Sequence, residues 1–322
     1  FSQPIKNIRV EDRNKRRKIL FNNKIDNNNL GYIILNSDIK KQLLNELKLK
    51  KNIKLINNNE FFSLQTLENK NIALFDKYKI ASKLVIAADG KNSTVRSFLK
   101  TKIFKKHYPH NALVVNFDHL KDHKNTAFEL FFKSGPLAIL PMKKRNKKYF
   151  SSSLIWTNTK DYTAQVKKLD KNLLRLILQE KIFSYTGNIS KIHSVQSFPL
   201  SAHINSSFYN NRLIYIGDSA HSIHPIAGQG WNLGVRDIVK CLSVLEYSEK
   251  LGLDIGSSEI CKKYHDLCYS DSFSLYQITD KLNSIFLNDK YILNWARAQG
   301  FKFIDNNKNI KNYITNFAMG FK

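Results

Sequence analysis

One stretch, Arg212–Gly234, constrains the fold of this chain more than any other feature of the sequence. It begins with a short apolar run, Leu213–Ile216, bounded by charge and glycine, which predicts a buried strand of a parallel sheet. A carboxylate, Asp218, comes just after this strand, beside Gly217. A proline, Pro225, then precedes a cluster of glycines: Gly228, Gly230 and Gly234.

A helical pattern follows the glycines, because apolar residues recur on one face: Val235, Ile238, Val239, Leu242 and Leu245. The order of strand, acid, glycine loop and helix start is typical of a ligand site, since strand ends of an open α/β sheet face a crevice. Glycine lets the backbone approach a flat or anionic ligand, and the N–H groups of a helix start stabilise negative charge. The alternative is a strand–helix turn that binds nothing.

A second apolar run, Leu84–Ala88, also ends in a carboxylate beside glycine, Asp89-Gly90, and precedes a helix that starts near Ser93 or Thr94. Two such ends in one sheet can converge on one elongated ligand with hydroxyl and phosphate groups.

Between these two runs, residues 107–200 are rich in short β-type segments, which predicts a mainly antiparallel sheet interrupted by a helix near 163–179. Further expected elements are a helix over 37–49, a hairpin over 71–82, strands within 1–25, and a mostly helical region after Asp254. The expected segments of the sheet are 112–117, 127–132, 137–140, 149–156 and 193–198.

The chain is strongly basic, with a formal net charge of +26, but the lysines are scattered and no basic stripe with interleaved aromatics occurs. We therefore predict no nucleic-acid partner and note that a cationic surface favours anionic lipids. No apolar run is long enough to predict a membrane-spanning helix. The three cysteines, Cys241, Cys261 and Cys268, fit a reducing cytosol and core positions, and the predicted location is cytoplasmic.

The two stretches together resemble the cofactor motifs of the flavin-dependent aromatic hydroxylases, which share the para-hydroxybenzoate hydroxylase fold. Asp89, Gly90, Ser93 and Arg96 match the second motif of that family. The third motif is matched by Gly217-Asp218-Ser219-Ala220-His221, by His224-Pro225, and by Gly228-Gln229-Gly230 with Asn232.

Other residues resemble one branch of this family, the hydroxylases of ubiquinone biosynthesis. These are Gly31-Tyr32 with Asn36, Gly135–Pro141, His224–Asp237 and the closing Ala318-Met319-Gly320. The resemblance runs essentially from end to end and implies an α/β fold of the α+β kind. It comprises a Rossmann-like FAD-binding domain, an inserted mainly antiparallel substrate sheet and a helical C-terminus.

The resemblance also implies roles for the residues that match it. Asp218 is expected to bind the ribityl chain of FAD, unless it is a solvated loop acid or an N-cap. Asp89 and Gly90 are expected near the pyrophosphate, where Arg96 either supplies positive charge or makes a structural ion pair. Gly217, beside Asp218, is also expected to bind the cofactor. Expected near the flavin ring are Pro225, Gly228, Gln229, Gly230 and Asn232.

For some side chains the sequence is compatible with two roles. Trp231 either covers the ring or packs in the core, and Gly135–Pro141 either faces the flavin or is plain sheet core. The same alternatives hold for a set of apolar residues that either line a substrate cleft or form core: Phe131, Phe132, Leu137, Ile139 and Leu154. His221 and His224 lack a third ligand placed with them, so no metal is predicted.

The implied reaction is flavin chemistry without an acid–base pair from the protein. NAD(P)H would reduce FAD, O₂ would form a C4a-hydroperoxyflavin, and this would hydroxylate the ring of a prenylated phenol or quinone precursor. The partners implied are this aromatic small molecule, O₂, and a peripheral association with the inner membrane or a biosynthetic complex. Two alternatives remain: a related oxidoreductase acting on another phenolic or prenyl substrate, and a non-catalytic cationic binding protein.

One departure from the family concerns the opening βαβ unit with G-x-G-x-x-G, a spacing that none of the twelve glycines provides. We therefore expect a fragment that lacks this first unit, with weak FAD binding by residues 1–322 alone. The domain boundaries expected are 26–104 with 203–250 for FAD, 1–25 with 105–202 for substrate, and 251–322 for the helical region.

Overall fold

The computed structural model describes residues 2–13, 17–22, 29–57, 59–287 and 291–319 and divides into two compact units. The first unit comprises residues 1–53, 108–200 and 284–322, and the second comprises residues 54–107 and 201–283. Gly320, which belongs to the closing part of the resemblance, lies outside the described residues.

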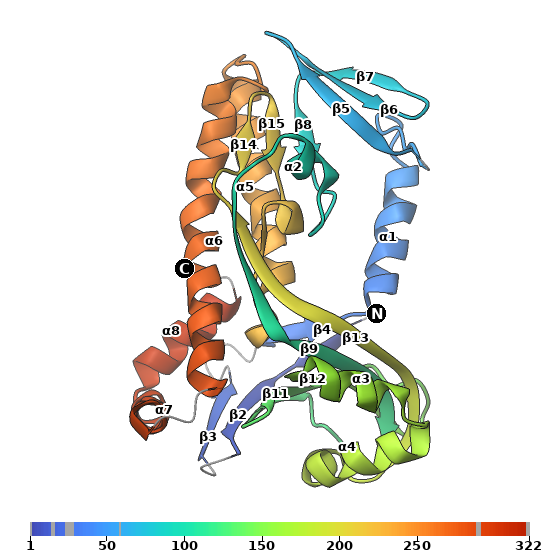
Figure 1. The fold of residues 1–322 in the computed structure, drawn as a ribbon, viewed down its shortest axis with the longest axis vertical. Coiled ribbons are helices and arrows are strands. Elements are labelled where there is room, and N and C mark those ends of the chain that lie inside the picture. The colour runs from blue at the N-terminus through green and yellow to red at the C-terminus, as the bar shows by residue number, and fades with distance from the viewer. Residues whose placement is uncertain (1, 14–16, 23–28, 58, 288–290, 320–322) are drawn as a thin grey trace. The chain divides into compact units, whose positions relative to one another are not determined.

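The first unit is built around one large sheet with the strand order β13-β9-β12-β11-β10-β2-β3 (Figure 1). The pairs β9–β12, β12–β11, β11–β10 and β2–β3 are antiparallel, whereas β10 and β2 run parallel. This unit contains the following strands and helices, of which β9 and β13 extend into the second unit: β1 (Gln3–Ile5), β2 (Asn7–Asp12), β3 (Arg17–Asn22), β4 (Gly31–Ile33), α1 (Asn36–Lys48), β9 (Ile103–His119), β10 (Thr126–Phe132), β11 (Gly135–Met142), β12 (Phe150–Thr159), α3 (Lys160–Lys168), α4 (Lys171–Thr186), β13 (Ile189–Asn205), α7 (Tyr291–Asn306) and α8 (Lys308–Met319).

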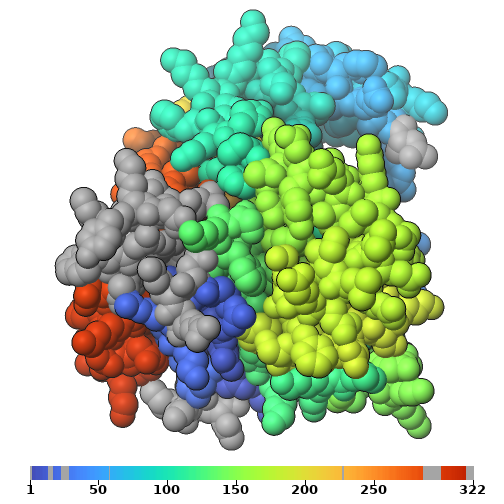
Figure 2. All heavy atoms as spheres, turned by 60° about the horizontal axis from the view of Figure 1, so that its bottom comes forward, coloured from blue at the N-terminus to red at the C-terminus, as the bar shows by residue number. Residues whose placement is uncertain are grey.

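Helices α3 and α4 cover one face of this sheet, and their atoms, yellow-green in Figure 2, form the surface there. Alternate residues of the central strands point into the core beneath them, because strand side chains alternate between faces. Leu113, Leu154 and Trp156 are at most 1% exposed there and pack with Leu178 and Ile182 of α4. Asp170 caps α4 by accepting hydrogen bonds from the N–H groups of its first turn.

The second unit holds the two apolar runs as neighbouring strands of a small sheet with the order β14-β15-β8. Strands β8 and β15 pair in parallel, with Leu213 opposite Val85 and Tyr215 opposite Ala87, which confirms the predicted parallel strand. Its other sheet, β5-β6-β7, contains the predicted hairpin over 71–82. The elements of this unit are β5 (Phe61–Thr66), β6 (Asn71–Phe75), β7 (Lys79–Ser82), β8 (Val85–Ala87), α2 (Thr94–Phe98), β14 (Tyr209–Asn210), β15 (Leu213–Tyr215), η1 (Gly217–Ser219), β16 (His221–Ser222), η2 (Ile226–Gly228), α5 (Gly230–Lys250) and most of α6 (Ser258–Leu287).

The core of the second unit lies between this small sheet and the long helices α5 and α6. Cys241, Cys261 and Cys268 are all buried in it, as predicted, and the hydroxyl of Tyr264 donates to the Tyr215 carbonyl at 2.9 Å. Burial of these thiols raises their pKa values, to about 12 for Cys268, so they are not reactive thiolates at neutral pH.

Helix α5 confirms the predicted helix but not the expected use of its apolar face. Four residues of that face are 37–61% exposed: Val235, Ile238, Val239 and Leu242. The face that packs inward instead carries Leu233, Asp237, Cys241, Val244 and Ser248. The apolar pattern located the helix, whereas a face containing an acid and a serine is the buried one.

Candidate functional site

The carboxylates Asp89 and Asp218 follow the ends of two neighbouring parallel strands, β8 and β15. Both side chains are exposed, while β15 is fully buried and β8 is buried at Ala87 only. The sequence predicted that these two strand ends lie in one sheet, and the register of β8 with β15 places them there. The arrangement can present two carboxylates to one elongated ligand at a single sheet edge.

The backbone around Asp218 is fixed by its neighbours. Gly217 has φ +62°, a left-handed conformation that favours glycine, and η1 begins there. The buried hydroxyl of Ser219 donates to the Ala87 carbonyl at 2.5 Å and accepts from the N–H of Ile216 at 3.1 Å. This loop therefore holds Asp218 outward while its neighbour Ser219 is tied to the sheet.

A buried acid–histidine pair fastens this loop to helix α5. Asp237 Oδ2 lies 2.6 Å from His221 Nε2 and accepts the Gly217 N–H at 3.0 Å. Both side chains are at most 2% exposed. A Cβ at Gly234 would lie 3.5 Å from the Gly217 Cα, so small residues let the helix approach the loop closely.

Asp89 contributes to the start of helix α2. Its Oδ2 accepts from the Thr94 hydroxyl and the Val95 N–H, both at 3.2 Å, while Ser93 caps the helix by accepting from the Arg96 N–H at 3.0 Å. Gly90 has φ +83°, which glycine tolerates. These contacts fix the loop 89–93 in one conformation.

The guanidinium of Arg96 is buried and joins the two loops. It donates to the carbonyls of Lys91 at 2.6 Å and Ser219 at 3.0 Å, and it lies 3.0 Å from His203 Nε2. Burial, with the nearby Arg96 charge second, lowers the pKa of His203 to about 3. The ring is therefore neutral at pH 7, and its Nε2 is suited to accept from Arg96.

The segment from Pro225 to Asn232 forms the open side of the site. Gly228 has φ +62°, and a Cβ on Gly228 or Gly230 would meet nothing within 4 Å. The amide of Asn232 donates to Gln229 Oε1 at 3.3 Å, and α5 begins at Gly230. Space beside glycines and the start of a 21-residue helix can receive a flat, negatively charged ring.

His224 and Trp231 have different surroundings in this segment. The Nδ1 atom of His224 accepts the Ile226 N–H at 3.3 Å, which supports the turn η2. Trp231 is 51% exposed, so the expectation that it packs in the core is wrong. His221 is already paired with Asp237, and neither histidine belongs to a metal-ligating group among the described residues.

Gly230→Ala tests whether the open side receives a ligand. We expect unchanged or slightly raised stability, because alanine favours helix and the new methyl group meets no protein atom. A bound flavin ring would meet that methyl group, at a cost of about 1–3 kcal/mol, which is about a 5- to 150-fold higher dissociation constant. Gly300→Ala in α7, which is equally unobstructed, is the matched control, and equal FAD affinities in the two variants would contradict this placement.

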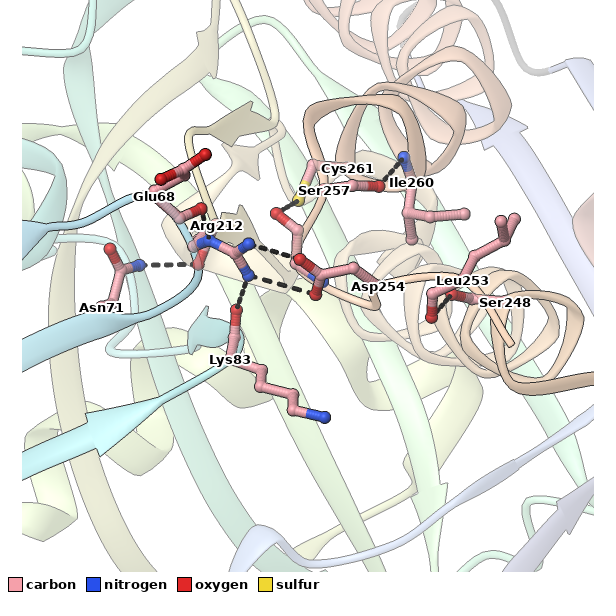
Figure 3. Close-up of polar contacts among 11 residues, drawn as sticks. Glu68, Asn71, Lys83, Arg212, Ser248, Leu253, Asp254, Ser257, Ile260 and Cys261 are labelled. Atoms are coloured by element: carbon pink, nitrogen blue, oxygen red, sulfur yellow. Dashed lines mark hydrogen bonds and ion pairs between the residues drawn. The ribbon is translucent and has the colours of Figure 1, made fainter. Parts of the chain in front are cut away.

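The start of β15 is held by Arg212, a residue for which no role was predicted. Its guanidinium donates to the carbonyls of Glu68 at 2.7 Å and Lys83 at 3.1 Å, and it pairs with the Asp254 carboxylate (Figure 3). The hydrogen bond from Arg212 lowers the pKa of the Asp254 carboxyl group. A Cβ at Gly256 would lie 2.0 Å from the Lys83 carbonyl oxygen, so glycine is required beside the clamp.

The two loops are therefore predictable from the sequence, whereas the residues that hold them are not. Asp237, Ser219 and His203 had no assigned role, although Asp237 and Ser219 lie within the stretches that were singled out. The signal for Asp237 was a lone acid on the helix face shared with Leu233 and Cys241. The signal is weak in a sequence, because a solvated acid at the same spacing is more common.

Comparison with known families gives one match over most of the chain. Residues 37–254 match the family described as FAD binding domain. That range contains both loops described above, 89–96 and 217–232.

Among curated proteins, the ubiquinone hydroxylase UbiL of Rhodospirillum rubrum is 29% identical over 320 residues, covering 99% of this chain and 73% of that protein. The 3-demethoxyubiquinol 3-hydroxylase of Escherichia coli is 25% identical, covering 90% of this chain and 73% of that one. Among solved structures, p-nitrophenol 4-monooxygenase from Pseudomonas putida has a TM-score of 0.78 at 13% identity, covering 99% and 81% of the two chains. This structural likeness confirms the predicted fold class.

Proposed function

Because the chain belongs to the FAD binding domain family, we propose that it acts as a flavin-dependent monooxygenase that hydroxylates an aromatic ring in ubiquinone biosynthesis. The observation that carries the proposal is the family match over 37–254, which includes both carboxylate loops. The named activities of the curated relatives support the choice of a prenylated phenol or quinone precursor as substrate.

The residues present fit the cofactor in three respects. Asp218 is exposed on a fixed loop, Gly228 and Gly230 leave open space, and the start of α5 lies beside them. Arg96, in contrast, directs its guanidinium to carbonyl groups and His203, which supports the structural alternative for this residue over direct contact with phosphate.

When bound and reduced by NAD(P)H, FAD supplies the oxygen-activating chemistry that hydroxylation needs. In this proposal Asp218 accepts hydrogen bonds from the ribityl hydroxyls. The N–H groups at the start of α5 stabilise negative charge on the reduced ring, as a preorganised dipole does. Asp89 and Gly90 lie on the pyrophosphate side, and Pro225, Gln229 and Asn232 border the ring.

The large sheet of the first unit is the substrate region in this proposal, in keeping with the expected boundaries of 1–25 and 105–202. Leu137, Ile139 and Leu154 do not line a cleft there, because they are at most 2% exposed in the core beneath the helices. A substrate would therefore use the other face of the sheet, which carries Ala138, Leu140 and Ile155.

The experiment supplies the purified protein with FAD, NADH or NADPH, O₂ and 2-prenylphenol, a soluble prenylated phenol. We expect a product that has gained one oxygen atom on the ring, detected by mass spectrometry, and loss of ubiquinone in a strain that lacks the gene. Normal ubiquinone in that strain, together with no oxygenated product, would exclude the proposal.

None of the helices in the described part of the chain is long and apolar enough to cross a membrane. We extend the proposal to peripheral binding on the cytoplasmic side of the inner membrane, supported by the net charge of +26 and by a substrate class that resides in lipid. Flotation with anionic liposomes tests this, and binding that salt does not weaken would count against it.

A further inference from the structure

A single carboxyl group lies in the middle of an apolar row that crosses the large sheet. The pairing register places one residue from each of six adjacent strands in this row: Val114, Ile155, Ala138, Glu129, Val10 and Ile19. Glu129 of β10 is the one titratable residue among these six.

The row lies on the face of the sheet opposite to the helix-covered core. Phe128 and Leu130, the neighbours of Glu129 in β10, both pack with that core, so the Glu129 side chain points to the other face. Five of the six residues in the row are half-buried, whereas their neighbours on the covered face are largely buried. The row itself is therefore partly open and, apart from Glu129, apolar, while Ala127 and Phe131, which flank Glu129 on this face of β10, are buried.

The environment of Glu129 favours its neutral form. Among the described residues, no hydrogen bond or ion pair to its carboxyl group occurs, and burial raises its pKa to about 7. A carboxyl group in an apolar wall without a partner costs stability, and such groups are concentrated at functional sites. A pKa near the working pH is also what a general base needs.

Other charged or titratable groups lie on neighbouring strands and helices. β11, on one side of Glu129, carries none. The groups on the same face of the sheet include Asp12, Arg17, His110 and Asp118, and those on the elements that pack against it include Tyr32, Lys302, Asp305, Lys308 and Lys311. None of these groups causes the raised pKa of Glu129, which results from burial of its carboxyl group.

We propose that this face binds the phenolic ring of the substrate and that Glu129 is the group that receives the proton of its hydroxyl. The inference rests on the proposed function, because the ligand class comes from there. The phenol O–H bond breaks, its electron pair stays on the phenol oxygen, and a new O–H bond forms on the Glu129 carboxyl group. The electron density of the ring rises, which favours hydroxylation, and the proton passes to water when product leaves.

The apolar neighbours in the row supply the rest of the recognition. Ala138 and Ile155 lie on the same side of the carboxyl group, where a ring and its prenyl substituent can exclude water. A carboxylate is an acceptor only, so the site selects a ligand that donates an O–H. A methoxy group in place of the reacting hydroxyl would leave that carboxylate unpaired.

The test is Glu129→Gln, which keeps the shape of the side chain and removes the base. With 2-prenylphenol as substrate, we expect kcat/KM of the wild-type protein to fall as the pH drops below about 7, where Glu129 becomes protonated. The variant should lose about 10²- to 10⁴-fold in kcat/KM at pH 8 and lose this acid limb. Glu180→Gln, at an exposed position on α4 in the same unit, is the matched control and should keep the wild-type profile.

A binding titration gives a readout that does not depend on turnover. Ultraviolet difference spectra should show that 2-prenylphenol binds the wild-type protein more weakly at pH 5.5 than at pH 8, while binding to the variant is independent of pH. Thermal unfolding supplies the fold control. The raised pKa keeps a proton on folded Glu129 between pH 4.5 and about 7, whereas the unfolded chain loses this proton in that range. The free energy of unfolding of the wild-type protein therefore falls as the pH rises through it. The melting temperature of the variant relative to wild type should therefore be higher at pH 8 than at pH 4.5.

Two results separate this inference from the proposed function. If wild-type protein forms the oxygenated product and Glu129→Gln keeps the same pH profile, the role of Glu129 is wrong while the function stands. If wild-type protein forms no oxygenated product, the function fails, and pH-independent binding of 2-prenylphenol would then overturn the inference as well.

Discussion

Replacing Asp237 with alanine is expected to lower the free energy of unfolding by about 3–5 kcal/mol, because it removes one member of a buried pair. His221 would keep a buried ring without its partner, and the Gly217 N–H would lose its acceptor. Urea unfolding measures the change. Asp266→Ala, at an exposed position on α6, is the matched control and should change stability by less than about 0.5 kcal/mol.

A second substitution at this position distinguishes a role in holding the cofactor loop from a role in overall stability. Asp237→Asn keeps an oxygen acceptor for Gly217 and should retain more stability than Asp237→Ala. If Asp237 positions the cofactor loop, the asparagine variant will still release FAD faster than wild type, because one acceptor must serve both His221 and Gly217. A loss of less than about 1 kcal/mol in Asp237→Ala would mean that the pair is not an anchor of the loop.

Asp218→Ala is expected to weaken FAD binding without weakening the fold. The side chain is exposed and its loop is held by Ser219 and Asp237, so stability should change by less than about 0.5 kcal/mol. Loss of a charged hydrogen bond to a ribityl hydroxyl costs about 1.5–3 kcal/mol, which is about a 10- to 150-fold higher dissociation constant. Flavin fluorescence titration measures this change.

Two further variants identify the cause of that loss. Asp218→Asn retains an acceptor oxygen and should lie between wild type and alanine. Asp266→Ala removes a carboxylate from the same unit, away from the loop, and should bind FAD as wild type does. If the two alanine variants weaken binding equally, the effect is one of net charge and Asp218 has no direct contact with FAD.

The sequence predicted the strands and loops of the site because their signals are local. An apolar run followed by Asp and Gly reports a buried strand and its turn within a few residues, and β8 and β15 are found where those runs lie. Their parallel pairing is a long-range contact, yet the presence of the same pattern twice was sufficient to predict one sheet edge. The β-rich insertion was recognised for the same local reason.

The sequence was less informative about which side of an element faces inward. For α5 the apolar stripe is exposed and the buried stripe contains Asp237 and Ser248, because specific hydrogen bonds there outweigh apolar content. In the large sheet, Leu137 and Ile139 are core, and Glu129 escaped notice although it is a lone acid within the apolar strand Thr126–Phe132. The role of Glu129 depends on the residues beside it on neighbouring strands, which the local sequence of β10 does not reveal.

The Arg96 bridge has a consequence for how quickly a cofactor is captured. Arg96 joins the loops 89–93 and 217–219 through the carbonyls of Lys91 and Ser219, using contacts within the protein alone. A ligand that arrives at these loops therefore does not spend binding energy on ordering them. Association should follow a single bimolecular step whose rate rises in proportion to ligand concentration, without the plateau that a slow loop rearrangement imposes.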